Sequence, residues 1–96
     1  VPQTAPNSIA DGLLTSLGSL TWPFVRDQVE RVLTVSEDAI RAGMRLVWER
    51  MKLVIEPSAG VGVAGGLGDE FRALPGVRKV GVVLCGGNVS LDKLYW

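Results

Sequence analysis

Apolar side chains recur every three or four residues over positions 40–54, which is the longest regular pattern in the chain. They are Ile40, Met44, Val47, Met51 and Val54. This spacing places them on one face of an α-helix. Ser36 precedes the pattern as a suitable N-cap, and Glu37 and Asp38 follow at the positive end of the helix dipole. The pattern therefore predicts an amphipathic helix that begins after Ser36 and runs to about Ile55.

Two prolines mark the expected starts of further helices. Pro23, in the pair Trp22-Pro23, suits a first helical turn because its missing N–H has no partner there. Pro57 ends the long helix and begins another, which covers the glycine- and alanine-rich residues 58–73. Residues 13–20 are small and apolar, and we expect a loop or a short helix there.

Two runs are typical of β-strands. Residues 32–35 are rich in β-branched side chains, and residues 79–85 form an apolar run that stops at the Gly86-Gly87 turn. Strands that alternate with helices along a chain favour a layered α/β fold. We therefore expect an α/β architecture.

Composition excludes several classes of function. Ten basic and ten acidic side chains give a net charge of zero, which argues against a nucleic-acid or membrane-surface partner. The apolar runs are too short to span a membrane, and no signal peptide is expected. The chain has no histidine, the commonest general base and zinc ligand. Its single cysteine fits a reducing, cytoplasmic compartment. Because the sequence starts without methionine, we expect the chain to be a fragment or a trimmed form of a longer protein.

Glycines in the third predicted helix match two motifs. Residues 60–65 fit G-x-G-x-x-G, but a dinucleotide loop lies directly between a strand and a helix, whereas here a helix and Pro57 come first. Gly62 and Gly66 also form a G-x-x-x-G step. We expect tight helix packing rather than nucleotide binding.

Two single residues are open to a structural and a functional interpretation. Cys85 is either a small buried apolar residue or a ligand contact at the carboxyl end of a strand. Glu56 is either a solvated helix end or a carboxylate at a pocket rim near a helix N-terminus.

Four stretches together resemble a known family. They are residues 8–12 (Ser-Ile-Ala-Asp-Gly), 21–23 (Thr-Trp-Pro), 46–64 and 83–89 (Val-Leu-Cys-Gly-Gly-Asn-Val). The third contains the specific runs Val-Trp-Glu-Arg-Met-Lys-Leu and Ile-Glu-Pro-Ser-Ala-Gly. The chain resembles the fold-type-II pyridoxal-phosphate enzymes, in the branch of serine racemases and serine/threonine dehydratases. The resemblance covers nearly the whole chain.

The resemblance implies both a fold and an activity. Residues 1–96 would form a partial domain, the C-terminal third of the parent enzyme, within a tryptophan synthase β-like large domain that has a parallel sheet with flanking helices. The parent would interconvert L- and D-serine with pyridoxal 5'-phosphate, and would eliminate water from serine as a side reaction. The alternatives are a threonine/serine dehydratase and a truncated, non-catalytic interaction fragment. The Schiff-base lysine of the family has no counterpart here, so the chain alone is predicted to be inactive.

The resemblance also implies roles for particular residues. Gly12, in an Ala-Asp-Gly turn, would lie against the cofactor ring, and Cys85 would touch its pyridine nitrogen. Glu56 would lie near the phenolic edge of the ring, and Gly86 would be a further cofactor contact. These positions are expectations carried over from the family motif.

Further partners follow from the same resemblance. Lys52 and Asn88 would contribute to a nucleotide site at a subunit interface. The full-length enzyme would be a homodimer that acts on a small amino acid and binds Mg²⁺ and ATP. No metal ligand is expected in residues 1–96.

Overall fold

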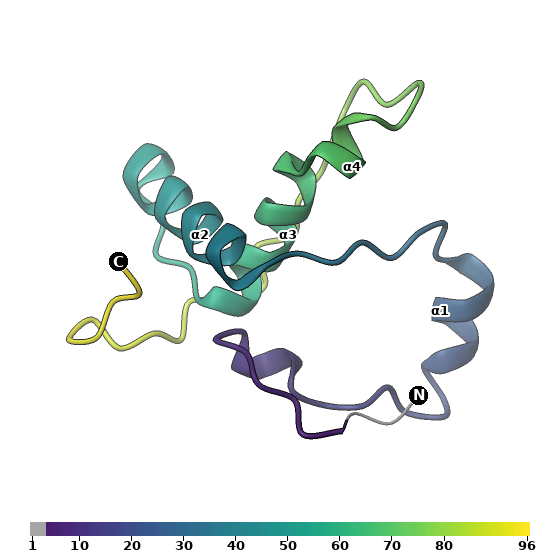
Figure 1. The fold of residues 1–96 in the computed structure, drawn as a ribbon, viewed down its shortest axis with the longest axis horizontal. Helices are drawn as coiled ribbons and strands as arrows, with labels where there is room; N and C mark the ends of the chain where they lie inside the picture. The colour runs from purple at the N-terminus through teal and green to yellow at the C-terminus, as the bar shows by residue number, and fades with distance from the viewer. Residues whose placement is uncertain (1–3) are drawn as a thin grey trace.

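The computed structural model describes residues 4–96, and its regular elements are helices (Figure 1). A short 3₁₀ helix, η1, covers Asp11–Leu13. The α-helices are α1 (Trp22–Gln28), α2 (Glu37–Met51), α3 (Pro57–Leu67) and α4 (Asp69–Arg72). Residues 4–96 contain no β-strand. None of their helices is both long and apolar enough to cross a membrane.

Helix α2 begins where the sequence predicts. The Ser36 hydroxyl accepts a hydrogen bond from the Ala39 N–H at 3.2 Å and so caps the first turn. Ile40, Met44 and Val47 of the predicted apolar face are buried, whereas Met51, the next residue of that face, is 57% exposed. Ion pairs lie on the exposed side of the helix, for example Arg45 with Glu49 at 2.7 Å.

Helix α2 ends at Met51, four residues before the predicted end. Lys52 takes the left-handed conformation (φ 59°, ψ 30°), and its ammonium group donates to the Glu49 carbonyl at 2.7 Å. A left-handed residue stops a helix and turns the chain away. The turn leaves Val54 53% exposed and buries Ile55, which is 3% exposed. The apolar repeat in the sequence therefore extends about one turn beyond the end of the helix.

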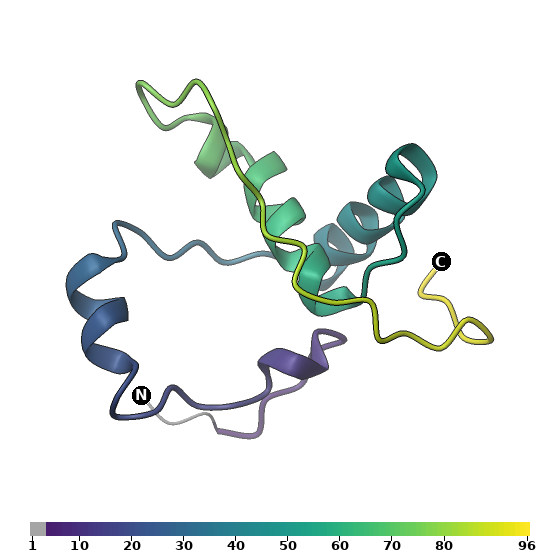
Figure 2. The same ribbon diagram turned by 180° about the vertical axis from the view of Figure 1, so that it is seen from behind.

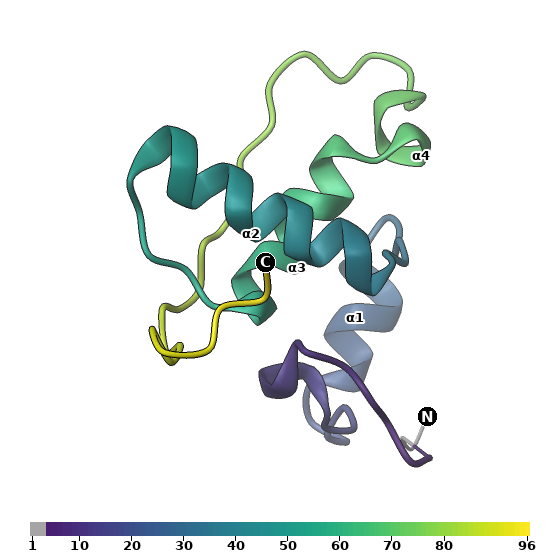
Figure 3. The same ribbon diagram turned by 60° about the vertical axis from the view of Figure 1, so that its left-hand side comes forward.

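Helices α2 and α3 cross in close contact (Figure 3). A Cβ on Gly43 would lie 3.2 Å from the Gly60 carbonyl oxygen, and a Cβ on Gly60 would lie 3.1 Å from that of Ile40. These distances leave no room for a side chain, so glycine permits the approach. The expected packing role of the glycine-rich segment is confirmed here, and residues 60–65 lie inside a helix rather than in a nucleotide loop.

Two other glycines of α3, Gly62 and Gly66, face a different neighbour. A Cβ on Gly62 would lie 3.2 Å from a methyl group of Val82, and one on Gly66 would lie 3.7 Å from the other methyl group. The G-x-x-x-G step therefore packs against residues 79–85, not against a helix. Helix α3 also ends earlier than expected, since Gly68 is extended (φ −68°, ψ 151°) and separates it from α4.

Neither run predicted as a strand forms one. Residues 32–35 lie in the connection from α1 to α2. Residues 79–85 come after α4 in the chain and run alongside α3 without regular secondary structure (Figure 2). A β-strand is defined by hydrogen bonds to a neighbouring strand, and residues 4–96 offer neither run such a neighbour. The two predicted strands are therefore not formed within the described residues, and the parallel sheet of the α/β fold stays a prediction about the parent.

The core lies between α2 and the start of α3. Its buried members are Met44, Val47, Ile55 and Ala59. Trp48, Val63, Leu84 and Val89 pack against them. The last segment of the chain thus adds side chains to the same core. Near its end, the ring of Trp96 meets that of Trp48 edge-on, with 5.3 Å between the centroids.

Helix α1 begins at Trp22 as the Trp-Pro pair predicts. It lies apart from the other helices, joined to them by extended connections on both sides (Figure 1). Leu20 is 85% exposed and Phe24 is 62% exposed, so the apolar side of this region has no cover in residues 4–96.

Candidate functional site

Three segments that are distant in sequence meet at the first turn of α3. They are residues 8–12, the helix start at residues 56–58, and residues 86–88. Pro57 fixes the start of the helix, and Glu56 precedes it as the N-cap residue without capping through its side chain. The helix therefore presents its positive end to the two neighbouring segments.

Gly12 is held against the start of α3 by its own backbone. Its N–H donates to the hydroxyl of Ser58 at 3.1 Å, and Ser58 is only 7% exposed. A Cβ on Gly12 would lie 3.0 Å from the same hydroxyl oxygen and 3.9 Å from a carboxylate oxygen of Glu56. The conformation of Gly12 is open to any residue, so space, and not backbone geometry, favours glycine here.

The Glu56 carboxylate lies against the turn at residues 86–88. Its Oε2 accepts a hydrogen bond from the Asn88 N–H at 2.8 Å, and the Glu56 N–H donates to the Gly86 carbonyl at 3.0 Å. A Cβ on Gly86 would lie only 2.7 Å from that same Oε2. Any side chain at position 86 would therefore displace the carboxylate. Glu56 is half-buried, so the interpretation as a fully solvated helix end is wrong.

Gly87 allows a second close approach, between the turn and the backbone of Val54. A Cβ there would lie 2.7 Å from the Val54 carbonyl oxygen, an atom that cannot move without moving the chain. Both glycines of the Gly-Gly-Asn turn are thus required for the turn to reach the segment that leads into α3.

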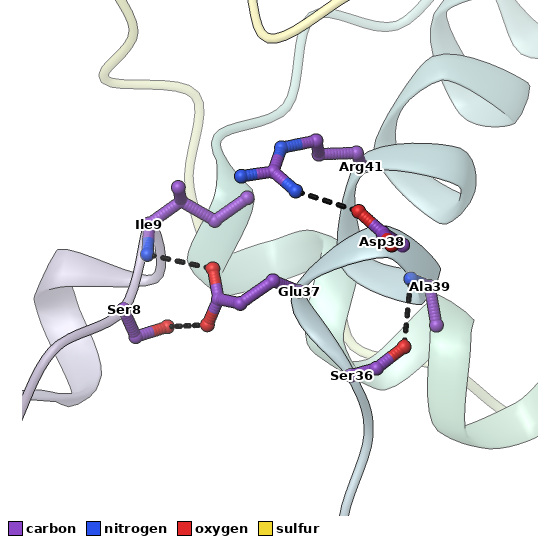
Figure 4. Close-up of polar contacts among 7 residues, drawn as sticks. All are labelled: Ser8, Ile9, Ser36, Glu37, Asp38, Ala39 and Arg41. Atoms are coloured by element: carbon purple, nitrogen blue, oxygen red, sulfur yellow. Dashed lines mark hydrogen bonds and ion pairs between the residues drawn. The ribbon is translucent and has the colours of Figure 1, made fainter.

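The segment before Gly12 is anchored to α2 (Figure 4). The Glu37 carboxylate accepts from the Ser8 hydroxyl at 2.6 Å and from the Ile9 N–H at 3.0 Å. The hydrogen bond from Ser8, followed by that from Ile9, lowers the pKa of Glu37 below its ordinary value. A lowered pKa keeps the carboxylate charged as the pH falls, and the anchor weakens only when the pH drops through that lowered value.

Cys85 is an exposed, free thiol directly before Gly86. The interpretation as a small buried residue is therefore wrong within the described residues. In the chain it directly precedes Gly86, whose carbonyl accepts from the Glu56 N–H.

Lys52 and Asn88, the predicted nucleotide contacts, serve other elements. Lys52 caps the carbonyl end of α2, and Asn88 binds Glu56 through its backbone N–H. No hydrogen bond joins the two residues in the part of the chain that the structure describes. Gly12, Glu56 and Gly86 are brought together; Lys52 is not part of that group.

Comparisons with known proteins show the family of the chain. The model of the pyridoxal-phosphate dependent enzyme family matches residues 1–86. The chain belongs to this family. It is 54% identical to serine racemase of Bos taurus over 92 residues and 53% identical to that of Homo sapiens over 93 residues. These matches cover 95% of the chain, but only 28% and 27% of the two relatives.

Three solved enzyme structures share the fold over the length of this chain. An aspartate racemase superposes with a TM-score of 0.91 at 45% identity, covering 95% of this chain and 29% of that one. Serine racemase of Dictyostelium discoideum gives a TM-score of 0.86 at 49% identity, covering 88% and 28%. A threonine deaminase gives 0.84 at 35% identity, covering 96% and 33%. The fold is thus that of the fold-type-II enzymes, and the chain spans about a third of each or less.

The residues at the site fit the cofactor that defines the family. Pyridoxal phosphate presents a flat aromatic ring, and a flat ring can approach a backbone that carries no side chain. Gly12 and Gly86 both lack a Cβ at positions where one would crowd Ser58 or Glu56. Cys85, whose thiol is exposed, directly precedes Gly86 in the chain.

Three residues of this region were not predicted from the sequence. Ser58 receives Gly12, and Glu37 and Ser8 hold the preceding segment. From the sequence, Glu37 is expected only to stabilise the positive end of the helix dipole. Its partners lie 28 and 29 residues away along the chain, and no local pattern signals a contact at that range.

Proposed function

We propose that this chain is part of a pyridoxal-phosphate dependent enzyme that interconverts L- and D-serine. We further propose that the parent eliminates water from serine as a side reaction, giving pyruvate and ammonia. Residues 1–96 would then be the C-terminal third of the parent, within its large domain. The identity of 54% to bovine serine racemase supports this substrate, and the placement of Gly12, Glu56 and Gly86 around one helix start carries the cofactor assignment.

Each residue has a distinct task in this proposal. When bound, the cofactor withdraws electrons from the substrate and so makes its Cα proton acidic. Gly12 offers one face of the ring an unobstructed backbone, and Ser58 holds that backbone in place. Gly86 allows the Glu56 carboxylate to stay close to the turn, held by the Asn88 N–H.

Cys85 would set the electronic character of the site. A thiol is a neutral and weak hydrogen-bond partner, so it would leave the pyridine nitrogen largely uncharged. A ring that is not fully protonated withdraws electrons moderately, which suits removal and return of a proton at Cα and loss of a β-hydroxyl. The exposed position of the thiol beside Gly86 supports this role.

Two alternatives concern the same site. Threonine deaminase shares the fold at 35% identity, so a threonine/serine dehydratase without racemase activity is the second candidate. The third is a truncated product that packs against a partner and does no chemistry. The higher identity to serine racemases, 44–54%, favours the racemase.

Further properties of the parent enzyme are proposed from the resemblance. It would be a cytoplasmic homodimer, and ATP and Mg²⁺ would bind to it. Lys52 and Asn88 stay the candidate nucleotide contacts. In that role, Lys52 would have to release the Glu49 carbonyl, to which its ammonium group donates at 2.7 Å.

A substrate comparison tests the proposal. The full-length enzyme that contains this chain should be incubated with L-serine, L-threonine and L-aspartate in turn, with and without pyridoxal 5'-phosphate. We expect D-serine and pyruvate from L-serine, both dependent on the cofactor. A 2-oxo acid from threonine and serine without any D-serine would establish the dehydratase instead. D-aspartate without D-serine would contradict the assignment of serine as substrate.

A further inference from the structure

Gly12 is fixed at the site by two anchors on two different helices. One is the hydrogen bond from its N–H to Ser58 of α3 at 3.1 Å. The other lies three to four residues earlier in the chain, where Ser8 and Ile9 bind Glu37 of α2. Helices α2 and α3 pack closely at their glycine crossing, so the distance between the two anchors is set by that packing.

The anchor at Glu37 is built from several connected hydrogen bonds. The Ser8 hydroxyl donates to the carboxylate at 2.6 Å and at the same time accepts from the Ala10 N–H at 3.1 Å. Ala10 is 2% exposed, and its carbonyl accepts from the Leu13 N–H at 2.9 Å. Continuous hydrogen bonds thus run from the carboxylate into η1, the turn that contains Gly12.

The position of Glu37 at the start of α2 does not require these contacts. Ser36 already caps the helix, and Asp38 also lies in the first turn, where it pairs with Arg41 at 2.8 Å (Figure 4). Glu37 instead turns its carboxylate to the segment at residues 8–10. A short hydrogen bond to a charged acceptor is stronger than one between neutral groups. The contact is therefore specific to Glu37 and not a general property of acidic residues at this helix end.

We propose that Glu37 is a positioning residue that holds the Gly12 turn against the cofactor, an inference that rests on the proposed function. Glu37 does not touch the cofactor or the substrate. It acts through Ser8, Ile9 and Ala10 on the place of Gly12. Without it, the turn would keep only the single hydrogen bond to Ser58, and the backbone surface for the ring would shift.

The test uses the full-length enzyme with two variants at this position and a matched control. Glu37→Ala removes the anchor, whereas Glu37→Gln keeps one carbonyl acceptor and should restore it in part. Asp38→Ala removes an acidic residue from the same helical turn without touching residues 8–12. The readouts are the Kd for pyridoxal 5'-phosphate, the circular dichroism of the bound cofactor, and amide hydrogen exchange over residues 8–14 of the cofactor-free protein.

We expect Glu37→Ala to raise the Kd by about three- to tenfold, because it removes both hydrogen bonds to a charged group at a partly exposed site, where each is weakened by solvent. The cofactor ellipticity should change and amide exchange over residues 8–14 should accelerate, with Glu37→Gln intermediate and Asp38→Ala like wild type. If Glu37→Ala does not fold, Ser8→Ala breaks the same anchor from the loop side and should give the same three changes.

Several outcomes would overturn the inference. Faster exchange with an unchanged Kd and ellipticity would mean that the anchor exists but does not position the cofactor. Equal effects of Asp38→Ala and Glu37→Ala would assign the effect to the charge of the helix start. A wild-type enzyme that binds no pyridoxal 5'-phosphate would overturn the proposed function itself, and this inference with it.

Discussion

At the scale of single residues, the site depends on glycines that have no room for a side chain. The backbone conformation at position 12 is allowed for any residue, but a Cβ added there would lie 3.0 Å from the Ser58 hydroxyl oxygen. In the full-length enzyme, we expect Gly12→Val to weaken cofactor binding at least about tenfold while the fold persists, because the valine would push the turn away. Absorbance of the bound cofactor in the purified variant measures this.

A matched control exists in the same chain. Among the described residues a Cβ on Gly81 would have no neighbour within 4 Å, so the small change Gly81→Ala should leave cofactor content unchanged. Full cofactor absorbance in Gly12→Val would contradict the role of this turn at the ring.

The thiol of Cys85 gives a second prediction at this scale. Cys85→Ser keeps a neutral hydrogen-bonding partner, so racemase and dehydratase rates should stay within about threefold of wild type. Cys85→Asp would introduce a charge that favours a protonated ring, and the ratio of the two rates should change by about tenfold or more. Steady-state assays of D-serine and pyruvate check both variants. Wild-type rates in both would mean that Cys85 does not touch the ring.

Some residues of the site could be predicted from the sequence, and others could not. The motif match identified Gly12, Glu56 and Gly86, and the structure brings these three together at the start of α3. Their roles toward a cofactor stay predictions. Ser58 and Glu37 were missed because each acts on a partner tens of residues away, and local periodicity carries no information about such contacts.

At the scale of elements, the crossing of α2 and α3 sets the frame in which the site lies. A Cβ on Gly60 would lie 3.1 Å from the Ile40 carbonyl oxygen, whereas one on Gly65 of the same helix would find its nearest atom at 4.0 Å. Overpacking in Gly60→Ala should cost the full-length enzyme about 1–3 kcal/mol of stability. Alanine gains about 1 kcal/mol in helix propensity, so the net loss should be up to about 2 kcal/mol.

Gly65→Ala serves as the control for helix propensity. It should leave stability unchanged or raise it by up to about 1 kcal/mol, because only the propensity term acts there. Chemical denaturation of both variants gives the comparison. Equal free energies of unfolding for the two would show that the helices do not cross as closely as described.

Helices and strands differed in how well the sequence predicted them. Helix starts were found at Trp22, after Ser36 and at Pro57, because caps and prolines act locally. The end of α2 was missed, since Lys52 in a left-handed conformation has no sequence signature comparable to glycine. The runs at 32–35 and 79–85 were assigned to strands that residues 4–96 cannot pair.

At the scale of the whole molecule, much apolar surface is left uncovered. A groove of about 590 Å³ lies between α2, α3 and residues 80–84, and its lining includes Leu46, Met51 and Val82. The chain spans about 28% of the length of its bovine relative, so we propose that the remainder of the parent covers such surfaces. Isolated, the 96-residue chain should therefore self-associate at micromolar concentration.

A pair of variants connects this association to the groove. Val82→Lys places a charge in the groove and should reduce self-association of the isolated chain. Leu91→Lys, at a residue that is 67% exposed and outside the groove, should not. Size-exclusion chromatography separates the outcomes. A monodisperse wild-type monomer with cooperative thermal unfolding would show instead that the chain is an autonomous domain.

The central claim is that this chain supplies one side of a cofactor site in an enzyme that removes and returns the Cα proton of serine. Proton exchange tests it most directly, because exchange precedes either product. L-serine should be incubated in D₂O with the full-length enzyme, and the Cα proton signal followed by NMR with and without pyridoxal 5'-phosphate. We expect loss of the signal only with the cofactor, and a much slower loss in Gly12→Val. A signal that persists with cofactor-loaded wild-type enzyme would contradict this claim.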